Sequence, residues 1–151
     1  MKVAIASDHG AVELRKEVMK VMDELGIEYE DFGCDGSCSV DYPDYALPVA
    51  EKVAKGEFDR GILLCGTGIG MSIAANKVPG IRCALVHDLF SAKATREHND
   101  SNILAMGGRI MGPGLGAEIA RVFLTTEFEG GRHERRVNKI KEYEKTSLSS
   151  N

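Results

Sequence analysis

The chain has 151 residues, close to the ~150 residues of a typical single domain, so we expect one domain spanning 1–151. Nineteen Lys and Arg against 23 Asp and Glu give a net charge of −4, which excludes a broad positive field for nucleic acid or an anionic membrane surface. The longest uncharged stretch, 61–76, contains 16 residues interrupted by glycines and is too short and polar to cross a bilayer. The four cysteines are too sparse for a disulfide scaffold and favour the reducing cytoplasm, with no membrane association.

Hydrophobic periodicity predicts strands and helices in alternation along the chain. For example, Leu14, Val18, Val21 and Met22 recur at helical spacing before Gly26, a residue typical of helix ends. In chain order we predict strand 3–6, helix 11–25, strand 27–32, helix 42–55, strand 61–65, helix 70–76, strand 82–86, helix 88–97, strand 103–106, helix 114–124, a charged helix 132–144 and a frayed tail 146–151.

This alternation predicts an α/β fold of the doubly wound, Rossmann-like class. We expect a five-stranded parallel sheet with helices on both faces and a C-terminal helix. Ligands of such sheets bind beyond the carboxyl ends of the strands, so the residues that directly follow each strand are the candidates for a site.

The clearest such segment is Cys65–Gly70, a glycine loop between a buried strand and a helix. Gly66, Gly68 and Gly70 let backbone N–H groups approach an oxyanion or phosphate at the helix N-terminus. The spacing lacks both the lysine of a Walker loop and the third glycine of a dinucleotide fingerprint, which disfavours nucleotide binding.

Cys65 stands at the head of this loop, where the helix field favours a thiolate. The alternative interpretation is a small buried core cysteine. A cysteine phosphatase would need an arginine six residues later, and that position is Met71.

Three further polar segments are candidate ligand sites: Asp8-His9, residues 98–102, and Arg132 with Arg136. Each of them also has a purely structural interpretation. Asp8 and His9 follow the first strand, where His9 could bind phosphate or carry a proton, or Asp8 could merely cap the next helix. Residues 98–102 could carry chemistry or form a solvated turn.

Near the C-terminus, Arg132 and Arg136 lie four residues apart, a spacing that suits a phosphate clamp, although a solvated charged face has the same pattern. Cys34 and Cys38 lack a second ligand pair, so we predict no metal.

Together these segments resemble the type B ribose-5-phosphate isomerases and the related galactose- and allose-6-phosphate isomerases. The resemblance covers nearly the whole chain. Six blocks carry it: Ala6-Ser7-Asp8-His9-Gly10, Asp41-Tyr42-Pro43, Cys65-Gly66-Thr67-Gly68-Ile69-Gly70, Ser72-Ile73-Ala74-Ala75-Asn76-Lys77, His98-Asn99-Asp100 and Gly130-Gly131-Arg132-His133.

The resemblance implies isomerisation between ribose 5-phosphate and ribulose 5-phosphate with no cofactor. It implies that Cys65 is the base that moves a proton between C2 and C1. Some relatives use a glutamate of this loop instead, at the position of Met71 here. In the remaining implied site, the backbone of Gly66, Gly68 and Gly70 stabilises the enediolate; Asp8, Thr67 and His98 open the sugar ring; Tyr42 and Asn99 hold the sugar; and His9, Arg109, Arg132 and Arg136 bind phosphate.

The predicted topology places these residues at two different edges. Asp8 and Cys65 follow strands, whereas His98 and Asn99 precede one, and a five-residue strand spans roughly 16 Å. We therefore predict a homodimer, which could pair further into a tetramer, whose sites are shared between subunits, as the resemblance also implies.

Two alternatives to a ribose-5-phosphate isomerase remain. One is an allose- or galactose-6-phosphate isomerase on the same scaffold. The other is a non-catalytic sugar-phosphate-binding module.

Overall fold

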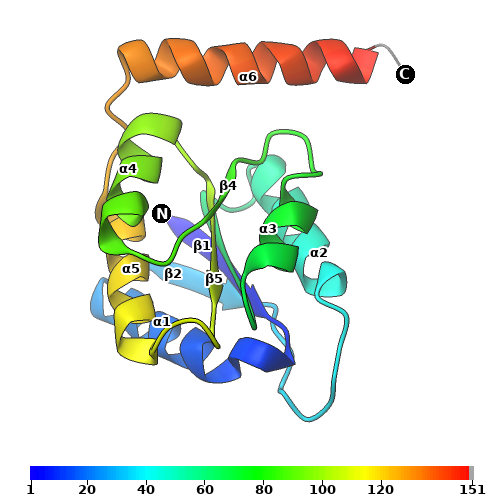
Figure 1. The fold of residues 1–151 in the computed structure, drawn as a ribbon, viewed down its shortest axis with the longest axis vertical. Helices are drawn as coiled ribbons and strands as arrows, with labels where there is room; N and C mark the ends of the chain where they lie inside the picture. Colours follow the sequence, from blue (N-terminus) through cyan, green and yellow to red (C-terminus); the bar gives the residue numbers. More distant parts are fainter. Residues whose placement is uncertain (150–151) are drawn as a thin grey trace.

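A computed structural model, which describes residues 1–149, contains one five-stranded sheet with helices on both faces (Figure 1). All strand pairs are parallel, and the spatial order is β2-β1-β3-β5-β4. The predicted fold class is confirmed. The strands are β1 (Lys2–Ser7), β2 (Glu28–Asp31), β3 (Arg60–Cys65), β4 (Cys83–Leu85) and β5 (Ile103–Gly107).

Six α-helices and one 3₁₀ turn occupy the described residues. They are η1 (His9–Ala11), α1 (Val12–Glu24), α2 (Pro43–Ala54), α3 (Ile69–Ala75), α4 (Leu89–Asn99), α5 (Pro113–Thr125) and α6 (Arg132–Ser149). None of them is long and apolar enough to cross a membrane.

The C-terminal helix is longer than predicted. The expectation of a frayed tail from 146 is wrong as far as Ser149, because α6 continues through this segment; positions 150–151 of the predicted tail lie outside the described residues. Likewise, α4 extends to Asn99, so His98 and Asn99 belong to its last turn rather than to the loop before β5.

Two apolar clusters hold the layers together. On one face of the sheet, Val3 and Ile5 of β1 pack in a cluster with residues of α1, α4 and α5. On the other face, Ala4 and Ala6 belong to a cluster with residues of α2 and α3. Because both faces of a central parallel strand are covered, β1 and β3 are apolar almost throughout rather than alternating.

The strand order creates a switch point between β1 and β3. The chain leaves β1 toward β2 on one side, whereas β3 pairs with β1 on the other. In open parallel sheets, a ligand crevice forms at the carboxyl ends of the two strands where the direction of winding reverses.

Helix α6 lies across the opposite end of the molecule, beside the amino ends of the strands (Figure 1). It packs on α4, and His133 and Val137 are its buried residues among those described. The fold therefore has two separate places where polar residues collect.

Candidate functional site

The carboxyl ends of β1, β3 and β5 meet at one place. Ser7 pairs with Leu64, and Cys65 pairs with Gly107, so Asp8, Cys65 and the residues after Gly107 emerge side by side. Three backbone hydrogen bonds join these loops: Asp8 N–H to the Leu64 carbonyl (3.1 Å), Gly108 N–H to that of Cys65 (2.8 Å) and Arg109 N–H to that of Gly66 (3.0 Å).

Cys65 is both a core residue and the first residue of the glycine loop. Its side chain belongs to the apolar cluster under α2 and α3, and the residue is only 5% exposed. Its Sγ nevertheless accepts a hydrogen bond from the Gly68 N–H at 3.0 Å. The contact places the backbone N–H of the glycine loop directly at the sulfur.

The loop can turn over the sulfur because of two glycines. Gly68 has a φ of +77°, a left-handed conformation that disfavours other residues. A Cβ on Gly107 would lie 2.6 Å from the carbonyl carbon of Thr67. The loop after β3 thus rests directly on the end of β5, backbone against backbone.

Asp8 and His9 are held in place by backbone N–H groups. The Asp8 Oδ1 accepts from Gly10 N–H at 2.8 Å and caps η1, so the predicted capping role of Asp8 is confirmed for this 3₁₀ turn. The His9 Nδ1 accepts from Val40 N–H at 3.2 Å. Nε2 is then the ring nitrogen that can donate to a ligand.

Arg109, Thr67 and Tyr42 surround the loop. Arg109 lies against Gly66 and the Tyr42 ring against Gly70. If these glycines carried a Cβ atom, it would be 3.3 Å from the Arg109 guanidinium and 2.7 Å from the Tyr42 ring, respectively. Thr67 is exposed, and its Oγ1 accepts from Ile69 N–H at 3.3 Å. The hydroxyl proton of Thr67 can therefore be donated to a ligand.

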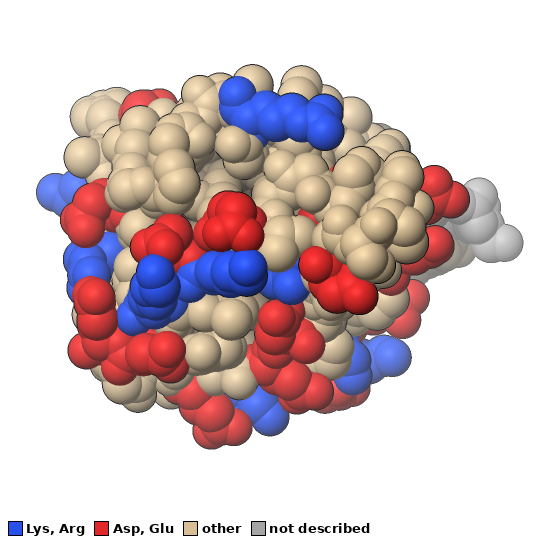
Figure 2. Space-filling model, turned by 90° about the horizontal axis from the view of Figure 1, so that it is seen from below, with Lys and Arg blue, Asp and Glu red and all other residues tan. Residues whose placement is uncertain are grey.

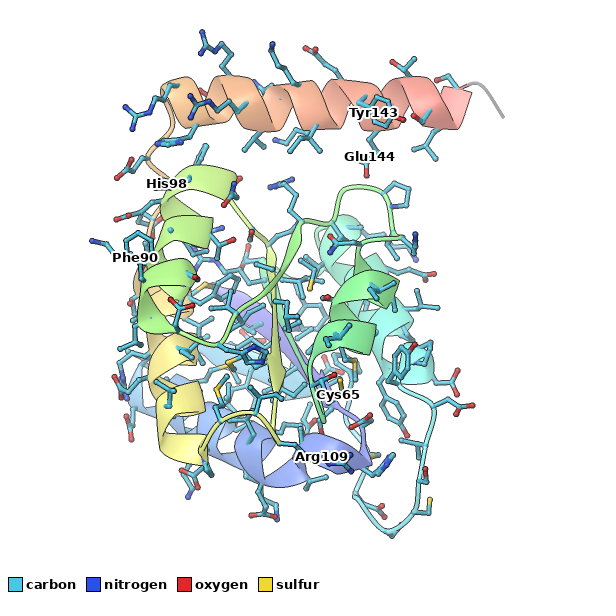
Figure 3. All side chains as sticks on the ribbon, in the orientation of Figure 1. Cys65, Phe90, His98, Arg109, Tyr143 and Glu144 are labelled. Atoms are coloured by element: carbon cyan, nitrogen blue, oxygen red, sulfur yellow. The ribbon has the colours of Figure 1, made fainter. Side chains whose placement is uncertain are left out.

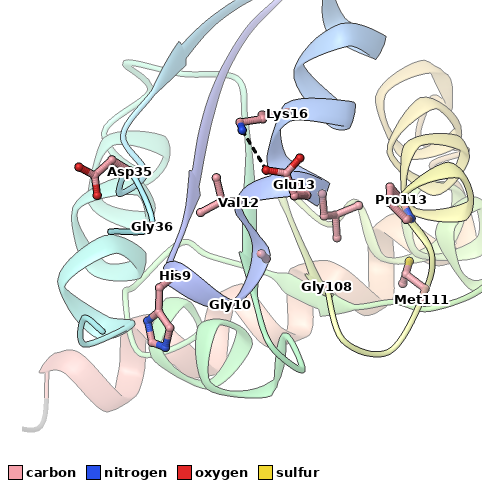
Figure 4. Close-up of a pocket in the computed structure, with 12 residues that line it drawn as sticks. His9, Gly10, Val12, Glu13, Lys16, Asp35, Gly36, Gly108, Met111 and Pro113 are labelled. Carbon is pink, nitrogen blue, oxygen red and sulfur yellow. Dashed lines mark hydrogen bonds and ion pairs between the residues drawn. The ribbon is translucent and has the colours of Figure 1, made fainter. Parts of the chain in front are cut away.

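A groove of about 470 Å³ continues from this edge along η1 and the start of α1 (Figure 4). His9, Gly10 and Gly108 form the end nearest the glycine loop, and Lys16, paired with Glu13, lies on the helix side. Seen from the carboxyl ends of the strands, this side of the molecule carries interspersed basic and acidic side chains rather than one broad charged patch (Figure 2). An anion site here depends on local groups.

A buried arginine braces the loop that leads to Tyr42. Arg15 donates from Nη1 to Ser7 Oγ and from Nη2 to the Cys34 carbonyl, both at 2.7 Å. Its Nε lies 3.3 Å from Asp31 Oδ1. These contacts tie the chain after β2 to the end of β1, a role that the sequence analysis did not assign to Arg15.

The remaining predicted site residues lie at the other end of the fold, as Figure 3 shows for His98 relative to Cys65 and Arg109. His98, Asn99 and Arg136 line a cavity of about 270 Å³ below α6. Arg132 opens α6 next to them and is exposed. Within one subunit, the predicted site residues therefore form two separate groups, one at the carboxyl edge of the sheet and one at the amino edge.

The turn that follows His98 and Asn99 is clamped by two arginines. Asp100, the one described residue other than glycine with positive φ (47°), accepts from Arg82 Nη2 and Arg96 Nη1, both at 3.1 Å. Arg82 also donates to the carbonyl oxygens of Asn99 and Asp100. The residues that follow α4, from Asp100 to Asn102, are therefore held firmly in place by these contacts.

The cysteines other than Cys65 do not share its setting. All four are free thiols, and burial raises the pKa of Cys83 to about 12, so this thiol stays protonated. Among the described residues, one group could hold a metal ion: His98, Glu129 and His133, whose ligand atoms lie within 4.8 Å of one another. Glu129 and His133 are four residues apart, whereas His98 is far from both in the sequence, so residue spacing alone does not reveal the grouping.

Comparison with known proteins agrees with this geometry. The family model described as ribose/galactose isomerase matches residues 3–140. A provisionally named sugar phosphate isomerase of Bacillus subtilis is 72% identical over 98% of this chain and 100% of its own length.

Two solved structures extend the comparison. The ribose-5-phosphate isomerase B of Clostridium thermocellum has a TM-score of 0.93 at 53% identity, covering 97% of this chain and 99% of its own. The ribose-5-phosphate isomerase B of Mycoplasma genitalium, solved with ribulose 5-phosphate bound, has a TM-score of 0.91 at 40% identity, covering 95% and 96%.

Substituting Gly107 tests whether the site depends on the close approach of two loops. We expect Gly107→Ala to lower the free energy of unfolding by about 1–3 kcal/mol, because the added methyl group overlaps the backbone of Thr67. Gly114→Ala is the control: its Cβ meets nothing within 4 Å, and it lies within α5. Urea denaturation measures both variants, and equal stabilities would contradict the contact.

The Asp100 clamp makes a separate prediction. We expect Asp100→Ala to cost about 2–4 kcal/mol, because two partly buried guanidinium groups lose their carboxylate and alanine disfavours the left-handed conformation. Asp100→Gly, which removes the carboxylate but accepts that conformation, should cost about 1 kcal/mol less. Thermal unfolding of both variants gives the comparison, and a stability loss below 1 kcal/mol in both would show that the clamp contributes little.

Proposed function

Because this chain belongs to the ribose/galactose isomerase family, we propose that it interconverts ribose 5-phosphate and ribulose 5-phosphate, an aldose–ketose isomerisation, within a single domain spanning 1–151. The observation that carries the proposal is the Cys65 sulfur, held under a glycine loop at the switch point of the sheet. The ribulose 5-phosphate bound to the Mycoplasma genitalium enzyme supports the choice of a pentose phosphate.

Cys65 is the base in the proposed mechanism. Its thiolate takes the proton from C2 of the open-chain aldose, the electron pair moves to the C1 carbonyl oxygen, and an enediolate forms. The hydroxyl proton on O2 passes to O1, and the thiol then returns its proton to C1 while the C2 carbonyl forms, which completes the ketose. Cys65 thus serves both proton transfers at carbon while the hydroxyl proton moves between the two oxygens, so the reaction requires neither a metal nor an organic cofactor.

Backbone N–H groups stabilise the enediolate. The N–H of Gly68 is engaged by sulfur, whereas the N–H of Gly70, in the first turn of α3, has no acceptor within its helix. Gly66 adds a further N–H at the start of the loop. Fixed donors of this kind act without reorganising when charge develops, which is their advantage over water.

The other residues open the ring and bind the substrate. Asp8, Thr67 and His98 handle hydroxyl protons during ring opening, and Tyr42 and Asn99 hold the sugar. His9 and Arg109 bind the phosphate together with Arg132 and Arg136, whose guanidinium groups suit a phosphate because each can donate two parallel hydrogen bonds.

We further propose that two subunits complete each site. His98, Asn99, Arg132 and Arg136 lie at the amino edge and cannot reach Cys65 of the same chain, so they serve the site of a second copy related by a two-fold axis. Exposed apolar side chains on α3, β4 and the start of α4 support a homodimer: Ile69, Ile73, Leu85, Leu89 and Phe90. Pairing of dimers into a tetramer is compatible with this assignment.

The cytoplasm is the proposed location. Four free thiols, one of them the base, agree with a reducing compartment.

Replacing the base tests the mechanism. We expect Cys65→Ala to bind ribose 5-phosphate with little change but to lose turnover by about 10²–10⁴-fold or more. Cys38→Ala, which removes an exposed thiol, should keep full activity. Formation of ribulose 5-phosphate is the assay, and near-normal turnover of Cys65→Ala would remove Cys65 from this role.

The same assay with allose 6-phosphate and galactose 6-phosphate ranks the substrates. We expect ribose 5-phosphate to have the highest kcat/KM. A higher value for either hexose phosphate would identify the protein as a hexose-6-phosphate isomerase, and binding without any turnover would favour a sugar-phosphate-binding module.

The shared site predicts complementation between two inactive variants. Cys65→Ala and His98→Ala subunits, co-expressed with different affinity tags and purified through both, form a heterodimer with one intact site. Its activity should be about half that of the wild-type dimer. The two homodimers serve as controls, and a heterodimer as inactive as either of them would contradict the shared site.

A further inference from the structure

Three potential metal ligands meet at the amino edge of the fold. His98 comes from the last turn of α4, Glu129 from the segment between α5 and α6, and His133 from the first turn of α6. Their ligand atoms lie within 4.8 Å of one another, and His133 Nε2 is already 3.4 Å from Glu129 Oε2. Ligands of a tetrahedral zinc ion are roughly 3.2–3.6 Å apart, so small side-chain rotations would close the set.

The buried imidazole of His133 points to a ligand. The residue is 6% exposed, yet its Nε2 has no hydrogen-bond partner among the described residues. Buried polar atoms nearly always have one. Neutral imidazole is the form that binds metal ions.

The backbone holds these side chains in register before any ion binds. The Glu129 N–H donates to the Glu97 carbonyl at 3.1 Å, which fastens the segment before α6 to the end of α4. The rings of His98 and His133 stack with centroids 4.3 Å apart and planes 13° from parallel. A preorganised set loses little conformational freedom when it takes up an ion.

The cluster is also open to solvent. The cavity of about 270 Å³ that His98 and His133 line offers an entry path and room for a water molecule as fourth ligand. Arg136 lines the same cavity, and its positive charge repels a cation. Within the cluster, Glu129 is the one negative charge that offsets this repulsion. The balance fits a weak, reversible site rather than a structural metal.

We propose that His98, Glu129 and His133 form an inhibitory site for a divalent cation of intermediate softness, such as Zn²⁺. Two imidazoles and one carboxylate with an open fourth position are a recurrent zinc ligand set. Its regulatory consequence rests on the proposed function: an ion bound to the His98 ring removes the proton carrier for ring opening, so the isomerase stops until the ion leaves.

Spectroscopy with Co²⁺ as a zinc substitute tests the ligand set without reference to activity. We expect full-length protein to bind one Co²⁺ per chain with visible d–d bands and no near-ultraviolet charge-transfer band from thiolate. A thiolate band would assign the ion to Cys65 or another cysteine and overturn the proposal. Because this readout needs no turnover, it decides the metal site even if the proposed isomerase activity fails.

A matched pair of variants tests the inhibition. Glu129→Gln should weaken Zn²⁺ binding, and inhibition by Zn²⁺, by about tenfold or more, while activity in the presence of a chelator stays unchanged. Glu127→Gln, an exposed carboxylate two residues earlier, should behave as wild type. Equal Zn²⁺ affinity of Glu129→Gln and wild type, measured by calorimetry, would overturn the proposal.

Discussion

The two edges of a parallel sheet are chemically unlike, and this constraint organises the whole molecule. Every residue that follows a strand emerges at one edge, and every residue that precedes a strand emerges at the other. Cys65 and Asp8 belong to the first class, whereas His98 and Asn99 belong to the second. The fold by itself therefore separates the two groups.

At the carboxyl edge, the site is built mainly from backbone. The loop after β3 lies on the end of β5 because Gly107 has no side chain, and Gly68 lets that loop turn so that its N–H meets the Cys65 sulfur. At the amino edge, the residues are held by side-chain contacts instead. Arg82 and Arg96 bind Asp100, and His133 stacks on His98. Each group is therefore rigid within one subunit, which is what a site assembled from two subunits requires of its parts.

Element order and fold class could be predicted because most strands contain a short apolar run, with β2 (Glu28–Asp31) as the exception, and the helices alternate with them. The separation of Cys65 from His98 followed from topology alone. The length of α6 could not be predicted, because residues 145–149 contain a single apolar side chain, Leu148, and so show no apolar pattern, although they continue the helix.

Contacts between distant segments also escaped prediction. The Arg15 brace, the contact of Arg82 with Asp100 and the stacked pair of histidines depend on how segments far apart in the sequence pack in space, and no local pattern encodes that. A sequence motif also does not say which atom a residue binds. For Asp8, only the structure shows that its carboxylate accepts from the Gly10 N–H.

The burial of Cys65 has a consequence for the chemical durability of the protein. A reactive sulfur in open solvent is prone to oxidation to sulfenic and higher acids, but that of Cys65 belongs to the core cluster and is screened by its own glycine loop. An oxygen atom added there would enlarge a side chain in a close-packed interior, which resists such growth. Packing thus protects the Cys65 sulfur from such growth, whereas the exposed Cys38 has no comparable protection.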